Sequence, residues 1–277
     1  MADDAKIPVL ASVRAAWAFF AGNWPRFIPS AALAALGAFV FFQGLAAGTP
    51  GPVLVGVAAG LLPAIAYRAA LFRFALRGEF GGMFGLKLGP DEGRLAAVTA
   101  MYSLFLFLIG LTAFACMSVV VAGLVAAGGD PAAVEAAVGD TEAAFASLGA
   151  AGQTGMIVGM FLIFCLLAFV WARLVLAGAA TVAEGRIVFL QSWPWTKGQV
   201  IPLLAASFLT ALPGFLAQWV LGALAVAASG AGLGPVAAFL SLTGALAGTL
   251  IGGMMGAGLM VYLYRGLRPP GDAPPQA

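Results

Sequence analysis

Histidine is absent from this chain, and cysteine occurs only at Cys116 and Cys165. The lack of histidine excludes Ser-His-Asp triads and histidine-based general acids, and two isolated cysteines do not provide the four ligands of a structural zinc site. Each cysteine lies within a long apolar run, where a thiol behaves as a small hydrophobic side chain. A disulfide between them is the alternative. We therefore predict no enzymatic activity, no metal site and no cofactor.

Charged residues are the second shortage. They make up 9% of the 277 residues, against roughly 25% in soluble domains, whereas hydrophobic residues make up 62%. A surface with so few charges is suited to lipid rather than to water. The net charge is only +2 and no basic run is interleaved with aromatic residues, so a nucleic-acid partner is not expected. The composition predicts an integral membrane protein.

Six apolar stretches are long enough to cross the membrane, because a helix needs about 20 residues to span roughly 30 Å of hydrocarbon. They cover residues 27–47, 53–76, 95–127, 155–182, 200–229 and 233–264. None of them contains Asp or Glu, which disfavours transport coupled to protons or sodium. We predict an all-α membrane domain over residues 27–264, in which six transmembrane helices form three hairpins.

Lysine and arginine occur at alternate junctions only. All thirteen lie in the N-terminal segment or near the ends of the second, fourth and sixth stretches, whereas the loop over residues 128–154 carries four acidic residues and no basic one. Basic residues collect on the cytoplasmic side because their translocation across the membrane is disfavoured. The alternation predicts that both termini are cytoplasmic.

Two segments are predicted to lie in the cytoplasmic interface rather than to span the membrane. The first, within residues 1–26, repeats large apolar side chains every three or four residues, which is typical of an amphipathic helix. These side chains are Leu10, Val13, Trp17, Phe20 and Trp24. The second covers residues 187–198. The Pro-rich residues 265–277 are predicted to form a disordered cytoplasmic tail.

Six basic residues near the predicted cytoplasmic ends of the spans are candidates for binding lipid headgroups. They are Arg68, Arg73, Arg77, Arg173, Lys197 and Arg265. Cations at this level can attract anionic lipids, and membrane lipids are the partner they predict. The simpler interpretation is that these residues anchor the helix ends by snorkelling, and Glu79 or Glu184 can pair with an arginine instead.

The sixth stretch carries glycines at four-residue spacing, which form three overlapping G-x-x-x-G units. These are Gly244, Gly248, Gly252 and Gly256. Such a stripe lets another helix backbone approach closely. The second helix can belong to the same chain or to a second copy, so the motif predicts either packing within the six-helix bundle or a homo-oligomer through the sixth span.

Several segments of the predicted cytoplasmic side carry a family resemblance. Residues 68–78 and 86–95 resemble a loop of uncharacterised six-span proteins of the proteobacterial inner membrane. Residues 173–177, 184–186 and 192–198 are also similar to the membrane domain fused to some glycerophosphodiester phosphodiesterases. The catalytic domain of those enzymes has no counterpart in these 277 residues. The resemblance therefore implies a polytopic protein of the bacterial inner membrane, and not a phosphodiesterase.

Together these features favour a non-enzymatic membrane protein that organises or senses lipid, or that scaffolds partner proteins. The alternative is a channel or permease for a small solute, whose path would be lined by Thr112, Ser118 or Gln218. An intramembrane enzyme ranks lowest, because the spans contain no histidine and no carboxylate.

Overall fold

The computed structural model describes residues 7–47, 50–128, 145–146 and 148–268. Over these residues the regular elements are all helices, and six helical stretches are long and apolar enough to cross a membrane. The all-α, six-span prediction is therefore confirmed, and the chain is a polytopic membrane protein. It divides into two compact units, one formed by Met1–Thr99 with Arg173–Ala277 and the other by Ala100–Ala172.

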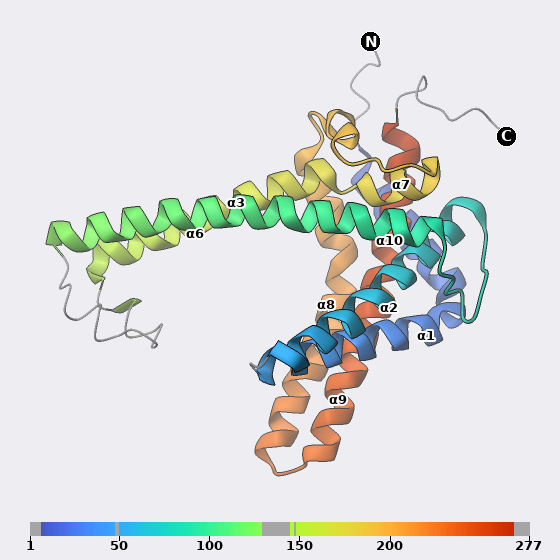
Figure 1. The fold of residues 1–277 in the computed structure, drawn as a ribbon, viewed down its shortest axis with the longest axis horizontal. Coiled ribbons are helices and arrows are strands. Elements are labelled where there is room, and N and C mark those ends of the chain that lie inside the picture. The colour runs from blue at the N-terminus through green and yellow to red at the C-terminus, as the bar shows by residue number, and fades with distance from the viewer. Residues whose placement is uncertain (1–6, 48–49, 129–144, 147, 269–277) are drawn as a thin grey trace. The chain divides into compact units, whose positions relative to one another are not determined.

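The first unit contains two pairs of long helices. α1 (Val9–Ala47) and α2 (Pro50–Arg77) lie side by side, and α8 (Val200–Gly230) packs against the sixth span (Figure 1). That span consists of α9 (Gly234–Ala247), a π-helical turn η3 (Gly248–Gly252) and α10 (Gly253–Leu267). The unit also includes the start of α3 (Pro90–Gly128), the short α7 (Ala177–Glu184), and the 3-10 turns η1 (Leu190–Ser192) and η2 (Pro194–Thr196).

The N-terminal amphipathic segment does not end at residue 26 as predicted. α1 continues through Pro25 and Pro29, which membrane helices tolerate because neighbouring groups satisfy the freed backbone. Its small side chains face the protein: the Cα of Ala16 lies only 3.2 Å from where a Cβ of Gly258 in α10 would be. Trp17 and Trp24, from the predicted apolar face, are exposed. Leu10 on that face is exposed as well, whereas Phe20 is partly buried and packs against the core, so only part of the predicted face points away from the first unit.

The fourth predicted span is not one helix. α6 (Gly149–Leu174) ends first, and α7 follows as a separate helix of 8 residues. α7 is buried: a Cβ at Gly178 would lie 3.2 Å from the ring of Phe72 and 3.4 Å from the side chain of Leu95. The apolar residues that extended the predicted span to residue 182 therefore form part of the protein core, because burial in protein and burial in lipid favour the same side chains.

An aromatic cluster in the core of the first unit fixes the loop between α2 and α3. The ring of Phe27 in α1 packs edge-on against Phe74 of α2 at 5.4 Å and against Phe80 of the loop at 5.2 Å between centroids. Gly85 adopts a left-handed φ of +81°, and a Cβ there would lie 2.6 Å from the Phe80 ring. Only glycine suits this position, so Phe80 and Gly85 together hold the loop against α1.

The second unit comprises α3 from residue 100 onward and α6 up to residue 172. The end of the Met117 side chain in α3 occupies the space that a Cβ of Gly159 in α6 would take, so the two helices approach each other closely there. Cys116 and Cys165 are exposed free thiols, so the alternative of a disulfide is wrong. The acidic residues predicted between these helices, and residues 269–277 of the tail, lie outside the described residues.

Candidate functional site

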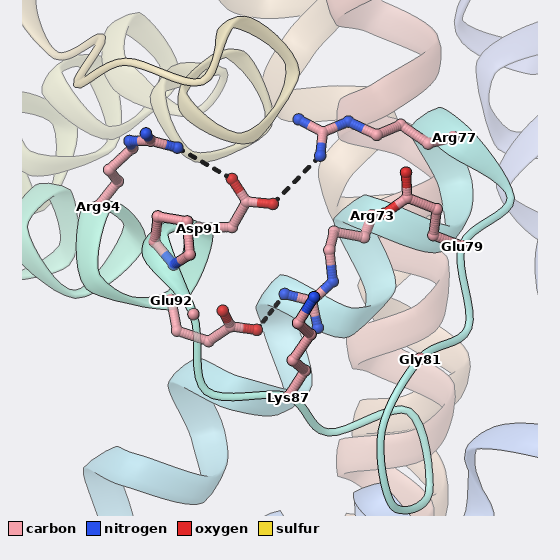
Figure 2. Close-up of a pocket in the computed structure, with 10 residues that line it drawn as sticks. Arg73, Arg77, Glu79, Gly81, Lys87, Asp91, Glu92 and Arg94 are labelled. Atoms are coloured by element: carbon pink, nitrogen blue, oxygen red, sulfur yellow. Dashed lines mark hydrogen bonds and ion pairs between the residues drawn. The ribbon is translucent and has the colours of Figure 1, made fainter.

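A polar pocket of about 340 Å³ lies where the end of α2 meets the loop over residues 78–89 and the start of α3. Its lining has one more basic than acidic side chain, and Figure 2 shows these side chains converging from the three segments. The basic residues are Arg73, Arg77, Lys87 and Arg94, the acidic residues are Glu79, Asp91 and Glu92, and Gly81, Gly89 and Pro90 complete the wall.

Local sequence explains why the charges meet here. α2 ends at Arg77 because Gly78 adopts a left-handed φ of +71°, the usual conformation after the last helical residue. α3 begins at Pro90, which lacks the N–H that a first-turn residue would leave unpaired, and it carries Asp91 and Glu92 in its first turn. Carboxylates are favoured there by the helix dipole. The loop then brings this acidic helix start against the basic end of α2.

Arg73 and Glu92 form the buried centre of the site. Their ion pair joins α2 to α3, and each side chain is only 6% exposed. Arg73 also donates a hydrogen bond to the carbonyl of Gly85 at 3.4 Å. Removing one member of a buried pair leaves an uncompensated charge, which is strongly destabilising. Arg73 therefore holds the loop and the two helices together.

Asp91 is shared between two arginines. Its Oδ2 accepts a hydrogen bond from Arg77 at 3.2 Å, and its Oδ1 accepts one from Arg94 at 3.3 Å. Arg77 donates a further hydrogen bond to the carbonyl of Val182 near the end of α7. The two arginine side chains are each 35% exposed. One carboxylate thus faces two cations that solvent or a ligand can still reach, which leaves this part of the pocket electropositive.

Two charged side chains of the pocket have no partner within the described part of the chain. Lys87 and Glu79 make no hydrogen bond or ion pair there, and in Figure 2 the Lys87 side chain reaches up into the pocket. An unpaired ammonium on a flexible stem can be used by a ligand without first breaking a contact.

Large apolar side chains are exposed on the same loop. Leu88 is 85% exposed, Met83 is 74% exposed, and Phe84 is 44% exposed. Leu88 directly follows Lys87 in the chain. The loop over residues 78–89 therefore carries a protruding apolar edge and also forms one wall of the cationic pocket, the arrangement expected where a loop enters the boundary between headgroups and acyl chains.

The structure separates the six predicted headgroup residues. Only Arg73 and Arg77 lie in the pocket. The guanidinium of Arg173 stacks on Trp193 at 5.3 Å, and Arg265 donates hydrogen bonds to the carbonyls of Ala75 and Leu76 at the end of α2. Lys197 is exposed next to η2.

Arg68 lies at a second pocket, of about 180 Å³, which is mostly apolar. Gly252, Gly253 and Gly256 of the sixth span are among the residues that line it. A Cβ at Gly256 would meet nothing within 4 Å, so this side of the glycine stripe is open.

The other glycines of the stripe face α8. A Cβ at Gly248 would lie 2.6 Å from Gln218 Oε1, and one at Gly244 would lie 3.1 Å from Leu221 Cβ. From the opposite side, a Cβ at Gly214 of α8 would lie 2.9 Å from the backbone nitrogen of Gly252. This geometry is the intramolecular packing that the motif allows. A homo-oligomer through the sixth span stays a prediction.

The acids paired with Arg73 and Arg77 were missed by sequence reasoning. Glu79 and Glu184 were the acids expected to be able to pair with an arginine, and Glu184 does pair with Arg186 and Arg268. The partners of Arg73 and Arg77 are instead Glu92 and Asp91. The run Gly89-Pro90-Asp91-Glu92 is a strong helix start, and it could have indicated carboxylates at a fixed position. It could not have indicated which arginines lie opposite.

Comparison with models of protein families, with curated protein sequences and with solved structures gives no match. The resemblance to the membrane domain of glycerophosphodiester phosphodiesterases therefore stays a prediction. The function has to be inferred from the pocket and its apolar loop.

Proposed function

We propose that this membrane protein binds phospholipid through the pocket between α2 and α3, and that it organises or senses lipid without catalysing a reaction. The observation that carries the proposal is the pairing of an electropositive pocket with exposed apolar side chains on the loop that forms one of its walls. The pocket matches the phosphate of a headgroup, and Leu88 and Met83 match the acyl region beside it.

The donors of the pocket suit a phosphate. Arg94 uses Nη1 for Asp91, and a guanidinium has five N–H groups, so further donors remain for a second acceptor. Lys87 contributes an ammonium that no carboxylate of the described chain neutralises. Charge-assisted hydrogen bonds from such groups to phosphate are about twice as strong as neutral ones. Arg73 contributes indirectly, because its pairing with Glu92 shapes the pocket.

The distribution of basic residues supports a location for this site. Basic residues accumulate on the cytoplasmic side of membrane proteins. The pocket holds four of the thirteen basic residues of the chain, so the proposal places it at the cytoplasmic face of a bacterial inner membrane.

The test compares two lysines of the chain. Lys87→Gln removes the unpaired cation of the pocket, and Lys197→Gln removes an exposed lysine outside it as a matched control. Each variant is purified in mild detergent, and the phospholipid retained per protein is measured by mass spectrometry. Lys87→Gln should lower retention several-fold while Lys197→Gln leaves it unchanged. Equal retention in both variants and the original protein would overturn the proposal.

A second variant tests the apolar half of the proposal. Leu88→Ser keeps every charge of the pocket and removes the most exposed apolar side chain of the loop. Binding to phospholipid nanodiscs should weaken, whereas the thermal stability of the protein should stay the same because Leu88 packs against nothing that its loss would disturb. Unchanged lipid retention would show that the loop does not contact acyl chains.

The permease alternative gains no support from the three polar residues expected to line a path. The hydroxyls of Thr112 and Ser118 donate to carbonyls of their own helix, at 2.9 and 3.0 Å. Gln218 lies against Gly248 in the contact between α8 and the sixth span. All three side chains serve local contacts.

A further inference from the structure

One polar atom of a pocket residue lacks a hydrogen-bond partner among the described residues. Glu92 Oε1 pairs with Arg73, but Oε2 of the same carboxylate is buried and has no hydrogen-bond partner among the described residues. A carboxylate has several lone pairs to satisfy, and a buried oxygen without a donor is costly. The Glu92 side chain is only 6% exposed, so bulk water does not readily donate a hydrogen bond to this oxygen.

The surroundings of Oε2 show how a ligand can supply the missing donor. A Cβ built on Gly89 would lie 3.4 Å from Oε2 and 4.0 Å from Cε of Lys87, so the oxygen and the lysine stem both border the space next to Gly89. Lys87 makes no hydrogen bond in the described part of the chain. Its ammonium can therefore turn towards a phosphate without breaking a contact.

We propose that the ligand of this pocket carries a primary ammonium as well as a phosphate, as the ethanolamine headgroup of phosphatidylethanolamine does. The inference rests on the proposed function. The phosphate lies among Lys87, Arg77 and Arg94, and the ammonium donates a hydrogen bond to Glu92 Oε2. A wall with four basic and three acidic side chains matches a headgroup with both signs of charge.

The need for a positively charged N–H donor at Glu92 Oε2 distinguishes the common phospholipid headgroups. The quaternary ammonium of phosphatidylcholine has no N–H to donate, so it leaves Oε2 unsatisfied. Phosphatidylglycerol has hydroxyl donors but no positive charge to place beside a carboxylate. Only the primary ammonium provides both, and the resulting hydrogen bond is charge-assisted.

The experiment measures relative affinities of the full chain for three lipids with identical acyl chains. The protein is incubated in detergent with equimolar phosphatidylethanolamine, phosphatidylcholine and phosphatidylglycerol, and bound lipids are counted by native mass spectrometry. We expect phosphatidylethanolamine to exceed phosphatidylcholine about tenfold, which is the discrimination given by one hydrogen bond to a charged group.

Glu92→Gln is unsuitable as a test because it would leave Arg73 buried without its charged partner. The ammonium contact is therefore tested with two glycine variants that change no charge. Gly89→Ala adds a methyl group beside Oε2 without changing any charge, and the φ angle of Gly89 is not left-handed. Gly81→Ala adds a methyl group to the same pocket where nothing lies within 4 Å. Gly89→Ala should bring the preference for phosphatidylethanolamine over phosphatidylcholine close to one, and Gly81→Ala should preserve it.

A competition distinguishes a lipid from a soluble source of the same headgroup. O-phosphoethanolamine should displace bound lipid more effectively than glycerol 3-phosphate, and displacement at micromolar rather than millimolar concentration would assign the pocket to the soluble compound. Equal displacement by the two compounds would overturn the ammonium contact for either source.

The outcomes also separate this inference from the proposed function. Equal binding of phosphatidylethanolamine and phosphatidylcholine by the original protein, or equal effects of Gly89→Ala and Gly81→Ala, would overturn the inference. If the inference fails in this way but Lys87→Gln still lowers the retention of every phospholipid, the proposed function stands without the ammonium contact. If Lys87→Gln has no effect on any lipid, both fail.

Discussion

Two helix contacts in the first unit are built from opposite kinds of residue. The contact between α2 and α3 uses a buried ion pair between Arg73 and Glu92. The contact between α8 and the sixth span depends on glycines, because Gly214 lies against the backbone of Gly252 and Gly248 leaves room for the Gln218 side chain. In lipid, burying an apolar side chain against another helix gains no hydrophobic free energy, because lipid tails are equally apolar. Helices therefore associate through close packing at small residues or through polar pairs such as these. Only the charged contact leaves groups that can bind a ligand.

The largest expected effect comes from breaking the charged contact. Arg73→Met leaves Glu92 buried without a counter-charge, which should cost about 3–5 kcal/mol of unfolding free energy. The measurement is denaturant unfolding in mixed micelles. The double variant Arg73→Met/Glu92→Met removes both charges and should recover most of the loss. If the double variant is as unstable as the single one, the contact depends on packing of the arginine rather than on charge.

The glycine contact should break by crowding instead. Gly214→Val places side-chain carbon against the backbone of Gly252 and should cost about 1–3 kcal/mol, the usual range for overpacking. Gly222→Val in the same helix is the control, because a Cβ there meets nothing within 4 Å. The two variants are compared by thermal denaturation in detergent. Equal melting temperatures would mean that α8 and the sixth span are not in close contact.

A smaller effect is expected at the π-helical turn, where α2 contacts the sixth span. The hydroxyl of Tyr67 donates a hydrogen bond to the carbonyl of Thr249 at 3.3 Å, and a Cβ at Gly253 would lie 2.8 Å from the tyrosine ring. Tyr67→Phe should cost about 0.5–1.5 kcal/mol in unfolding experiments. Tyr262→Phe, at an exposed tyrosine of α10, should cost nothing measurable. Equal losses would contradict a role for the Tyr67 hydroxyl.

The smallest effect on stability is expected for a variant that distinguishes helix packing within one chain from association between two chains. Gly256→Leu adds a side chain on the open side of the glycine stripe, so the unfolding free energy should change by less than about 0.5 kcal/mol. If the sixth span forms a homo-oligomer through this side, the oligomer mass measured by light scattering should fall. An unchanged mass together with unchanged stability would remove the homo-oligomer prediction.

Hydropathy predicted the helices correctly because it is a local property. Runs of about 20 apolar residues without charge have few alternatives to a membrane helix. The same property misplaced two boundaries. Pro25 and Pro29 lie inside α1, and the apolar residues 177–182 form the buried α7 instead of continuing α6. The identity of a hydrophobic residue does not indicate whether its side chain will be covered by lipid or by protein.

The site was less accessible to sequence reasoning than the helices. Charge counting found Arg73 and Arg77 but grouped them with Arg173, which stacks on Trp193, and with Arg265, which donates to backbone carbonyls of α2 and does not line the pocket. The acids that complete the pocket begin a different helix, and the path of the loop between them depends on the left-handed φ angles of Gly78, Gly82 and Gly85. Each of these glycines turns the chain by an amount that composition does not reveal.

The sequence by itself determined that this chain is an all-α membrane protein, because scarce charge and long apolar runs leave no other stable arrangement of its backbone hydrogen bonds in lipid. It also determined that its few charges gather at helix ends. Only the tertiary structure decided which of those charges neutralise each other. Arg73 and Glu92 become a buried pair, whereas Lys87 remains available to a ligand. The reason is physical: Coulomb energies depend on distance and burial, and both are set by how a glycine-rich loop folds between two helices.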